Sequence, residues 1–175
     1  MYLTYKDITI RNAVSSDAEL LAKWWNDGAV MAHAGFPNGL GTTVEKVSAG
    51  LATDSDTTRR RLILLFKNLP IGEMCYQNMG AKTSDIDIKI CESSYQEHGI
   101  GRVALSLLIQ YLFDVGYEKI TLDTNLRNTR AQHVYEKLGF EKLRVNIDSW
   151  RNQLGELESA VDYELTKENF INFAV

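Results

Sequence analysis

No apolar run in this sequence approaches the roughly 18 to 20 residues that a membrane-spanning helix needs, so we expect no membrane partner. The first residues lack the basic start and long apolar stretch of a secretion signal, and we therefore expect a cytoplasmic protein. Cysteine is scarce, and Cys75 and Cys91 form neither a CxxC pair nor a metal-ligand spacing. We expect two reduced thiols. The three histidines are scattered, which gives no reason to expect a metal.

Basic residues are too few to make a basic surface, because 19 lysines and arginines stand against 23 acidic residues and the net charge is −4. Proteins that bind nucleic acid need positive charge against its phosphates, so we expect no nucleic-acid partner. The acidic balance is compatible with a cationic substrate. The only basic cluster, Arg59 to Arg61, is either a solvated strand entry or a binding patch.

The apolar fraction of 45% is enough to fill a core, and no repeat or linker divides the 175 residues. We therefore expect one domain over residues 1–175. Hydrophobic periodicity predicts a mixed α/β chain in the order strand, two helices, three strands, helix, strand, helix, two strands. The expected strands cover residues 7–13, 62–66, 70–77, 84–91, 119–124, 140–147 and 160–165, and the expected helices cover 16–27, 44–53, 99–115 and 128–138.

Several of these elements carry local signals. Ser15 or Ser16 can cap the first helix, with Glu19 completing a capping box. The glycine-rich residues 28–41 predict a loop. The apolar run LILLF at residues 62–66 predicts a strand that is buried on both faces. The helix expected from residue 99 is apolar nearly all round, and its polar residues form one stripe at four-residue spacing: Arg102, Ser106, Gln110 and Asp114.

A glycine-rich stretch, QEHGIGRVA at residues 96–104, leads into this helix and has three interpretations. It is a plain turn, since glycines are common in turns. It also fits the G-x-G-x-x-A fingerprint of dinucleotide-binding folds, with Asp123 about 20 residues later. A polar loop separates the stretch from the preceding strand, however, and too few strand–helix units follow. In the third interpretation, backbone N–H groups at the helix N-terminus hold a pyrophosphate, assisted by Gln96 and Arg102. A kinase-type P-loop is excluded, because Gly-Lys-Ser/Thr does not occur.

The third interpretation is supported by a second block. The stretch from Gln96 fits Q/R-x-x-G-x-G/A, and NTRAQHVYEKLGF at residues 128–140 resembles N-x-x-A-x-x-x-Y-E-K-x-G-F. Both are signatures of the GNAT (GCN5-related) N-acetyltransferases, which the chain resembles. Residues 25–27, WND, and 163–165, YEL, resemble stretches of the RimJ/RimL-like branch. The resemblance covers nearly the whole chain and is strongest from Ile86 to Phe140.

The resemblance implies a central, mostly antiparallel sheet of about seven strands with one splayed parallel pair, flanked by about four helices. The splayed strands would be residues 84–91 and 119–124, with acetyl-CoA between them. The first strand would pair with the pantetheine, the amide of Asn128 would hold it, and an N–H near Ile90 would stabilise an oxyanion. The residues expected on the cofactor are Ile88, Ile90, Cys91, Gln96, Glu97, His98, Gly99, Ile100, Gly101, Arg102, Asn128 and Tyr135.

The implied reaction is direct transfer of an acetyl group from the thioester to an amine. An amine with a pKa of about 10 is mostly protonated at neutral pH, so a base is useful, and the departing thiolate benefits from a proton donor. We expect Tyr135 to be the donor, while its ring packs among apolar neighbours. Glu73 is the expected base, although a solvated strand carboxylate is the alternative interpretation, and Glu92 is a second candidate. Asp87 lies either at the surface or in the cleft.

The residues expected at the acceptor site are Trp25, His33, Phe36 and Glu92. Adjacent residues on a helix are about 100° apart, so one of Trp24 and Trp25 should pack inside while the other lines the site. We expect an N-acetyltransferase acting on a primary amine, either a small molecule or a protein N-terminus. An aminoglycoside 6′-N-acetyltransferase is a specific alternative, and a non-catalytic acyl-CoA-binding module is an alternative of another class. Dimers are common among such proteins, so a homodimer is one expected assembly.

Overall fold

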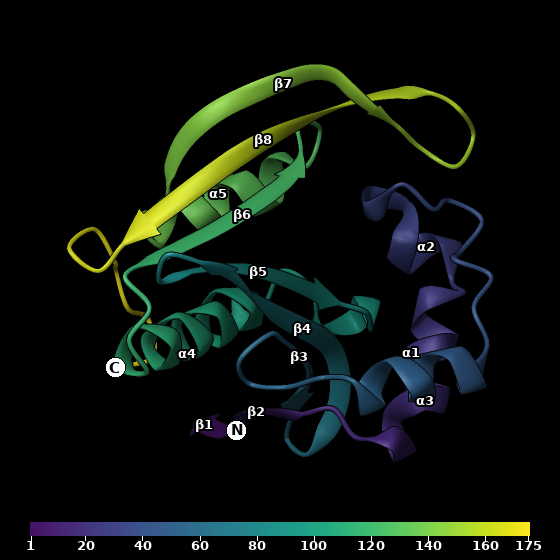
Figure 1. Cartoon of the computed structure of the whole chain (residues 1–175), viewed down its shortest axis with the longest axis horizontal. Coiled ribbons are helices and arrows are strands. Elements are labelled where there is room, and N and C mark those ends of the chain that lie inside the picture. Colours follow the sequence, from purple (N-terminus) through teal and green to yellow (C-terminus); the bar gives the residue numbers. More distant parts are fainter.

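A computed structural model describes residues 1–175, and its eight strands form one sheet flanked by five α-helices (Figure 1). The strands lie in the order β1-β2-β3-β4-β5-β6-β8-β7, and only β5 and β6 run parallel. The strands are β1 Tyr2–Tyr5, β2 Ile8–Asn12, β3 Arg59–Phe66, β4 Leu69–Gly80, β5 Thr83–Ile90, β6 Lys119–Asn125, β7 Glu141–Arg151 and β8 Leu157–Thr166. The α-helices are α1 Ala18–Trp25, α2 Gly28–Met31, α3 Val44–Ala52, α4 Ile100–Asp114 and α5 Thr129–Lys137. The predicted mixed α/β class is confirmed.

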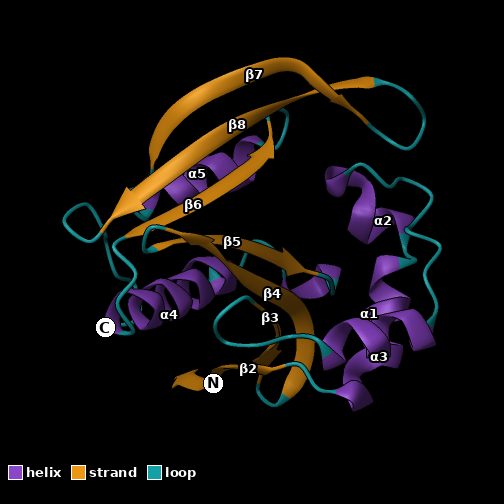
Figure 2. Ribbon diagram, in the orientation of Figure 1, coloured by secondary structure: helices purple, strands orange, loops and turns teal.

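The helices are divided between the two faces of the sheet (Figure 2). Side chains of α4 and α5 belong to a core cluster of 23 buried residues, and those of α1 and α3 belong to a second cluster of 9. Strand β3 contributes to both, because Leu62 and Leu64 lie in the larger cluster and Ile63 in the smaller, each fully buried. The strand is therefore buried on both faces, as its apolar run predicts. Each such side chain contributes roughly 1.5–3 kcal/mol to stability.

The parallel pair separates after three residues. Residues 83–85 of β5 pair with residues 119–121 of β6, and no pairing between the two strands follows. Strand β5 nevertheless continues beside β4 as far as Ile90, and β6 continues beside β8 as far as Asn125. The sheet thus divides into two halves that diverge from Asp85 onward, which is the predicted splay.

Two elements were not expected, so the strand and helix numbers are each one higher than predicted. The hairpin strand β1 precedes β2, with the turn at Lys6 in the left-handed region at φ 52°. Helix α2 is a single turn within the glycine-rich segment that was expected to be a loop. The Asp27 side chain caps this turn by accepting a hydrogen bond from the N–H of Ala29 at 2.8 Å. An aspartate at the N-cap position is a sequence signal for the start of a helix. A helix of four residues, however, is too short to show the hydrophobic periodicity that would support the prediction.

The predicted capping box of the first helix is wrong. Helix α1 begins at Ala18, and the residue that organises its entry is Asp17 rather than Ser16 or Glu19. The Asp17 carboxylate accepts a hydrogen bond from the backbone N–H of Val14 at 2.8 Å and forms an ion pair with Arg11 at 2.7 Å. Asp17 is buried, and the hydrogen bonds to both of its carboxylate oxygens offset the cost of burying the charge.

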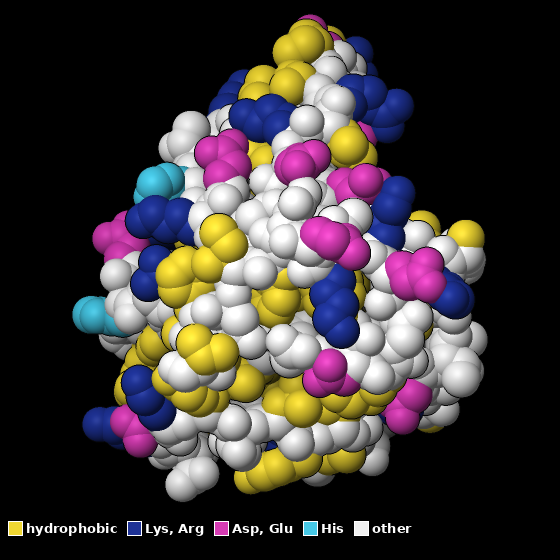
Figure 3. All heavy atoms as spheres, turned by 90° about the vertical axis from the view of Figure 1, so that its left-hand side faces the viewer, with side chains coloured by type: hydrophobic (Ala, Val, Ile, Leu, Met, Phe, Trp, Pro, Cys, Tyr) yellow, Lys and Arg dark blue, Asp and Glu magenta, His cyan; other side chains and the backbone are white.

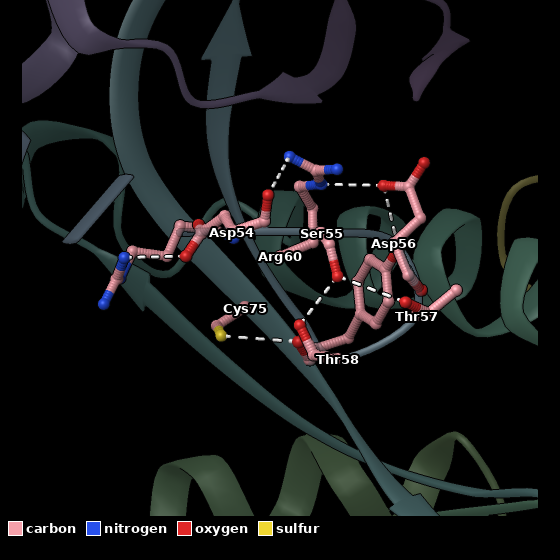
Figure 4. A network of polar contacts seen from close by, with 9 residues as sticks. Asp54, Ser55, Asp56, Thr57, Thr58, Arg60 and Cys75 are labelled. Atoms are coloured by element: carbon pink, nitrogen blue, oxygen red, sulfur yellow. Dashed lines mark hydrogen bonds and ion pairs between the residues drawn. The ribbon is translucent and has the colours of Figure 1, made fainter. Parts of the chain in front are cut away.

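The arginine run at the start of β3 is engaged with acidic residues of the preceding loop (Figure 4). The guanidinium of Arg60 donates to Asp56 Oδ1 at 2.7 Å, and that of Arg61 donates to Asp54 Oδ1 at 2.8 Å. The cluster therefore holds the loop between α3 and β3 in place, and two of its three positive charges are paired within the chain.

Charges of both signs are interspersed with apolar groups on the face shown in Figure 3.

The last two strands form a hairpin longer than predicted, because β7 reaches Arg151 and β8 begins at Leu157.

Gly139 ends α5 in the left-handed region at φ 95°, as its position predicts. A side chain could not be accommodated there, since a Cβ would lie 1.8 Å from the carbonyl oxygen of Asn169.

None of the helices is both long and apolar enough to cross a bilayer.

Candidate functional site

A cavity of about 810 Å³ lies along the edge of β5 that β6 leaves open. This volume lies within the range of about 300–1,000 Å³ typical of ligand pockets. Its walls come from β5, the loop before α4, the first turn of α4, helix α5 and the α2 region. Eleven of the residues expected to contact the cofactor line it: Ile88, Ile90, Gln96, Glu97, His98, Gly99, Ile100, Gly101, Arg102, Asn128 and Tyr135. Cys91 does not line it and lies buried in the smaller core cluster instead.

The wall formed by β5 offers backbone hydrogen-bonding groups to the cavity. The N–H of Cys91 donates to the carbonyl of Ile71 at 2.9 Å, which is a bond toward β4. Alternate residues of an antiparallel strand direct their polar groups to opposite sides, so those of Ile88 and Ile90 face the cavity. In keeping with this, the N–H of Ile88 donates to Asp87 Oδ1 at 2.8 Å, and the carbonyl of Ile90 accepts from Gln96 Nε2 at 2.9 Å. An extended ligand can replace these side-chain bonds by pairing as an added strand.

One end of the cavity is the N-terminus of α4. Gly99 precedes the helix in the left-handed region at φ 75°, and Glu97 is also left-handed at φ 65°. The first N–H groups of a helix have no acceptor within it, so those of residues 100–102 are free to bind an anion. The N–H of Val103 is the first of the helix to be satisfied, by the carbonyl of Gly99 at 3.3 Å.

The facing wall of α5 is basic, a feature that the sequence interpretation missed. Arg130, His133 and Lys137 all line the cavity, and their spacing of three and four residues puts them on one face of the helix. Arg130 also donates to Glu97 Oε1 at 2.9 Å, which ties α5 to the loop before α4. The spacing of three and four residues between these side chains was the sequence signal that could have predicted this face. A positive face opposite a helix N-terminus is suited to a phosphorylated ligand.

Tyr135 and Asn128 present polar groups that no other part of the chain uses. The Tyr135 ring is 7% exposed and packs edge-on against Phe140 and Tyr163, at centroid distances of 5.9 and 5.8 Å. Its hydroxyl makes no hydrogen bond within the protein, and burial raises its pKa, so the phenol keeps its proton. Asn128 caps α5, since its Oδ1 accepts from the N–H of Ala131 at 3.2 Å. Its Nδ2 has no partner in the chain and can donate into the cavity.

The expected base, Glu73, lies behind the cavity wall. It is 8% exposed, does not line the cavity, and accepts a hydrogen bond from Trp25 Nε1 at 2.7 Å. Lys89, which does line the cavity, places its Nζ 3.6 Å from Glu73 Oε1 and 2.6 Å from Asp87 Oδ2. Burial raises the pKa of the Glu73 carboxyl, and the charge of Lys89 opposes that rise. Lys89 was not among the expected site residues.

The remaining acceptor candidates are spread around α1 and α2. Trp24 is the buried member of the tryptophan pair, at 2% exposure, and its Nε1 donates to Glu92 Oε1 at 2.8 Å. Each tryptophan thus binds one of the two glutamates expected near the acceptor. His33, in a 3₁₀ turn at Ala32–Ala34, lines the cavity, whereas Trp25, Phe36 and Glu92 do not.

The point where the strands diverge is marked by a partly buried carboxyl group. Asp85 accepts a hydrogen bond from Thr121 Oγ1 at 2.8 Å, and burial raises its pKa to about 6. The usual value is about 4, so the folded protein binds this proton more tightly than the unfolded chain. Ionised Asp85 therefore lowers stability progressively as the pH rises from about 4 to about 6, and the full loss applies above that range.

Substituting Asp85→Asn should remove this loss. Allowing for screening by solvent, we expect a gain of roughly 1 kcal/mol at pH 8, which corresponds to a Tm about 2–4 °C higher. Near pH 4 the two proteins should melt together. Thermal unfolding between pH 4 and 8 measures the difference, with Asp7→Asn as a control because Asp7 is exposed. A variant that melts at or below the wild-type Tm at pH 8 would contradict the assignment.

The tip of the β7–β8 hairpin is fastened to the segment after α2, and Figure 1 shows the two side by side. The N–H of Gln153 donates to the carbonyl of Gly35 at 2.8 Å. Its side chain accepts from the N–H of Asn38 at 2.9 Å and donates to the carbonyl of Gly39 at 3.0 Å. Trp150 packs directly over Gly35, where a Cβ would lie 2.4 Å from the indole. We call this contact the Gln153 clasp.

Gln153→Ala should loosen the clasp without unfolding the chain. It removes two side-chain hydrogen bonds of about 1 kcal/mol each, so amide exchange at Asn38 should become at least about tenfold faster. Hydrogen–deuterium exchange measures this. Leu154→Ala is a matched control, because Leu154 lies at the same tip, is 58% exposed and makes no hydrogen bond to residues 35–39. Unchanged exchange at residues 35–39 would show that Trp150 and the backbone bond from Gln153 to Gly35 hold the clasp without the Gln153 side chain.

The family model described as "Acetyltransferase (GNAT) domain" matches residues 7–141. No curated protein matches the chain.

Several solved structures share its fold. A spermidine N-acetyltransferase from Vibrio cholerae, in complex with CoA and spermine, is similar with a TM-score of 0.84, 18% identity, and coverage of 95% of this chain and 99% of that one. RimL, a ribosomal L7/L12 alpha-N-protein acetyltransferase in complex with coenzyme A, has a TM-score of 0.83, 14% identity, and coverage of 95% and 98%. A GNAT-family acetyltransferase from Bacillus anthracis has a TM-score of 0.79, 19% identity, and coverage of 96% and 99%.

Proposed function

Because the chain belongs to the GNAT acetyltransferase family, we propose that it moves the acetyl group of acetyl-CoA directly to a primary amine within a ternary complex. The family match confirms the predicted family, the acyltransferase activity and acetyl-CoA as cosubstrate. The observation that carries the proposed mechanism is the composition of one cavity. It has a free strand edge on one wall, a helix N-terminus at one end and the unbonded hydroxyl of Tyr135 on another wall.

These groups support a binding mode for the cosubstrate. The diphosphate would accept hydrogen bonds from the N–H groups of residues 100–102, with the basic face of α5 opposite. The pantetheine would pair with the backbone of Ile88 and Ile90, and Asn128 Nδ2 would donate to it. This arrangement would bring the thioester toward Tyr135, because Tyr135 lines the same cavity as Ile88, Ile90 and Asn128.

The chemistry follows from that position. The neutral amine nitrogen attacks the thioester carbonyl carbon, the carbon–sulfur bond breaks, and an amide bond forms. Tyr135 gives its proton to the departing thiolate, and the proton lost by the amine passes to a base. We propose Glu73 as that base, because burial raises its pKa toward the pH at which it must take up a proton. Glu92 remains the second candidate. Since Lys89 stands between Glu73 and the cavity, Lys89 must move or a water must carry the proton.

The proposed acceptor is a primary amine, and three classes of amine are candidates. The resemblance of residues 25–27 and 163–165 to the RimJ/RimL-like branch favours a protein N-terminus. RimL is named as an alpha-N-protein acetyltransferase, and the similar Vibrio cholerae enzyme is named for spermidine. An aminoglycoside is the third class in this proposal.

A panel of acceptors tests the function. Thiol release from acetyl-CoA is measured with spermidine, an aminoglycoside and a short peptide with a free N-terminus, and the same peptide acetylated at its N-terminus is the control. We expect release with at least one free amine and none with the blocked peptide. CoA binding without release on any amine would favour the non-catalytic module, and absence of CoA binding would overturn the proposal.

A further inference from the structure

The polar stripe of α4 is covered by another part of the chain. Residues 169–175 run along this helix, and Figure 1 places the end of the chain beside it. Ser106 is fully buried, and its Oγ accepts a hydrogen bond from the N–H of Phe173 at 3.0 Å. Asn172 Nδ2 donates to Gln110 Oε1 at 3.3 Å. The stripe therefore serves as the docking seam of residues 169–175, which we call the strap.

The strap is fixed at several points along its length. The N–H of Ile171 donates to the carbonyl of Leu138 at 2.9 Å, next to the end of α5. The rings of Phe170 and Phe113 pack with centroids 5.7 Å apart. The carbonyl of Val175 accepts a hydrogen bond from the Tyr5 hydroxyl at 2.8 Å. The strap thus has a defined position relative to both helices that flank the cavity.

The stripe ends at Arg102, which belongs to the cavity as well as to the seam. Arg102 lines the cavity in the first turn of α4, and its guanidinium carbon lies 4.2 Å from the centroid of the Phe173 ring. Its Nε is buried and has no hydrogen-bond partner in the protein. The guanidinium also forms no ion pair within the chain, and because Nε is enclosed, its terminal nitrogens are the groups left to meet an anion in the cavity.

We infer that the strap is a positioning element of the cosubstrate site: Phe173 holds the guanidinium of Arg102 at the N-terminus of α4, where it donates to a phosphate of coenzyme A. This inference rests on the proposed binding of coenzyme A in the cavity. The stacked ring restricts the rotamers of a flexible side chain before the ligand arrives, which lowers the entropy cost of binding. Phe173 touches Arg102 and is argued to act only through it.

The first test measures CoA binding alone by titration calorimetry, with no acceptor present. We expect Phe173→Ala to weaken CoA binding about tenfold, and Phe173→Tyr, which keeps an aromatic face, to restore it. With a good acceptor, Phe173→Ala should raise the KM for acetyl-CoA by a similar factor and leave kcat unchanged. Phe170→Ala is the matched control, because it removes a strap ring that packs on Phe113 instead of Arg102. It should lower the Tm yet keep the wild-type Kd for CoA.

A double-mutant cycle separates positioning from general loosening. If Phe173 acts through Arg102, Phe173→Ala should cause no further loss of CoA affinity in an Arg102→Ala background. The same variants titrated with 3′-dephospho-CoA identify the phosphate. The effect of Arg102→Ala persists if the partner is the diphosphate and vanishes if it is the 3′-phosphate.

Two results would overturn the inference: wild-type affinity in Phe173→Ala, or losses that add fully in the double variant. A wild-type protein that fails to bind CoA would instead overturn the proposed function.

Discussion

Replacing Tyr135 by phenylalanine is expected to lower kcat by about 100-fold, while the KM for acetyl-CoA stays within about threefold of wild type. The substitution removes one hydroxyl that makes no hydrogen bond within the protein. The ring keeps its edge-on contacts with Phe140 and Tyr163, so the fold should be unaffected. Under the proposed mechanism, what is lost is the proton that burial keeps on the phenol and that Tyr135 would give to the departing thiolate. Steady-state kinetics on the best acceptor measures the change.

Tyr163→Phe provides the matched control for this experiment. Its ring is fully buried 5.8 Å from that of Tyr135, but its hydroxyl donates to Glu136 Oε1 at 3.0 Å and does not line the cavity. Removing it costs about 1 kcal/mol of stability and should leave kcat near wild type. If Tyr135→Phe retains full kcat, or if both variants lose activity equally, Tyr135 is not the proton donor.

Replacing Glu73 by glutamine is expected to lower kcat/KM about 100-fold at pH 7 and to change the pH profile. In the wild type, activity should rise as the pH passes upward through the raised pKa of Glu73, because only the carboxylate accepts a proton. In the variant, activity should instead rise steadily toward the pKa of the acceptor amine, which is about 8 for a protein N-terminus and about 10 for an alkylamine, because a smaller fraction of the amine is then protonated. The variant should fold, since Lys89 keeps its bond to Asp87 at 2.6 Å.

Two further variants make this test specific. Trp25→Phe removes the indole N–H that stabilises the ionised form of Glu73, so the rising limb of the profile should move to higher pH. Glu92→Gln changes the other carboxylate, which is bonded to Trp24, and should leave the limb in place. If Glu92→Gln abolishes the rising limb of the pH profile and Glu73→Gln does not, Glu92 is the base and Glu73 is not.

The cosubstrate side of the site was largely predictable from the sequence because its parts are local. A helix N-terminus preceded by glycines, a strand with alternating isoleucines and an asparagine that begins a helix each occupy a short stretch. The free edge at Ile88 was what the resemblance to the GNAT N-acetyltransferases implied, and it exists because β6 separates from β5, whereas the turn at Gly99 follows from the local pattern. The fully buried β3 and the left-handed Gly139 were predictable for the same reason.

The acceptor side depended on contacts between residues far apart in the chain. Glu73 and Trp25 meet across the interface between the sheet and α1, and Gln153 binds Gly35 across more than a hundred residues. Such pairs leave no periodic signal, because each partner satisfies its local preferences equally well without the other.

The polar stripe of α4 illustrates the same division. The sequence by itself determined that the stripe exists, since side chains four apart share one face of a helix. Only the tertiary structure decided that residues 169–175 cover it and that Phe173 lies against Arg102. The physical reason is that local sequence specifies which groups a segment exposes, whereas chain topology specifies which segment arrives to satisfy them.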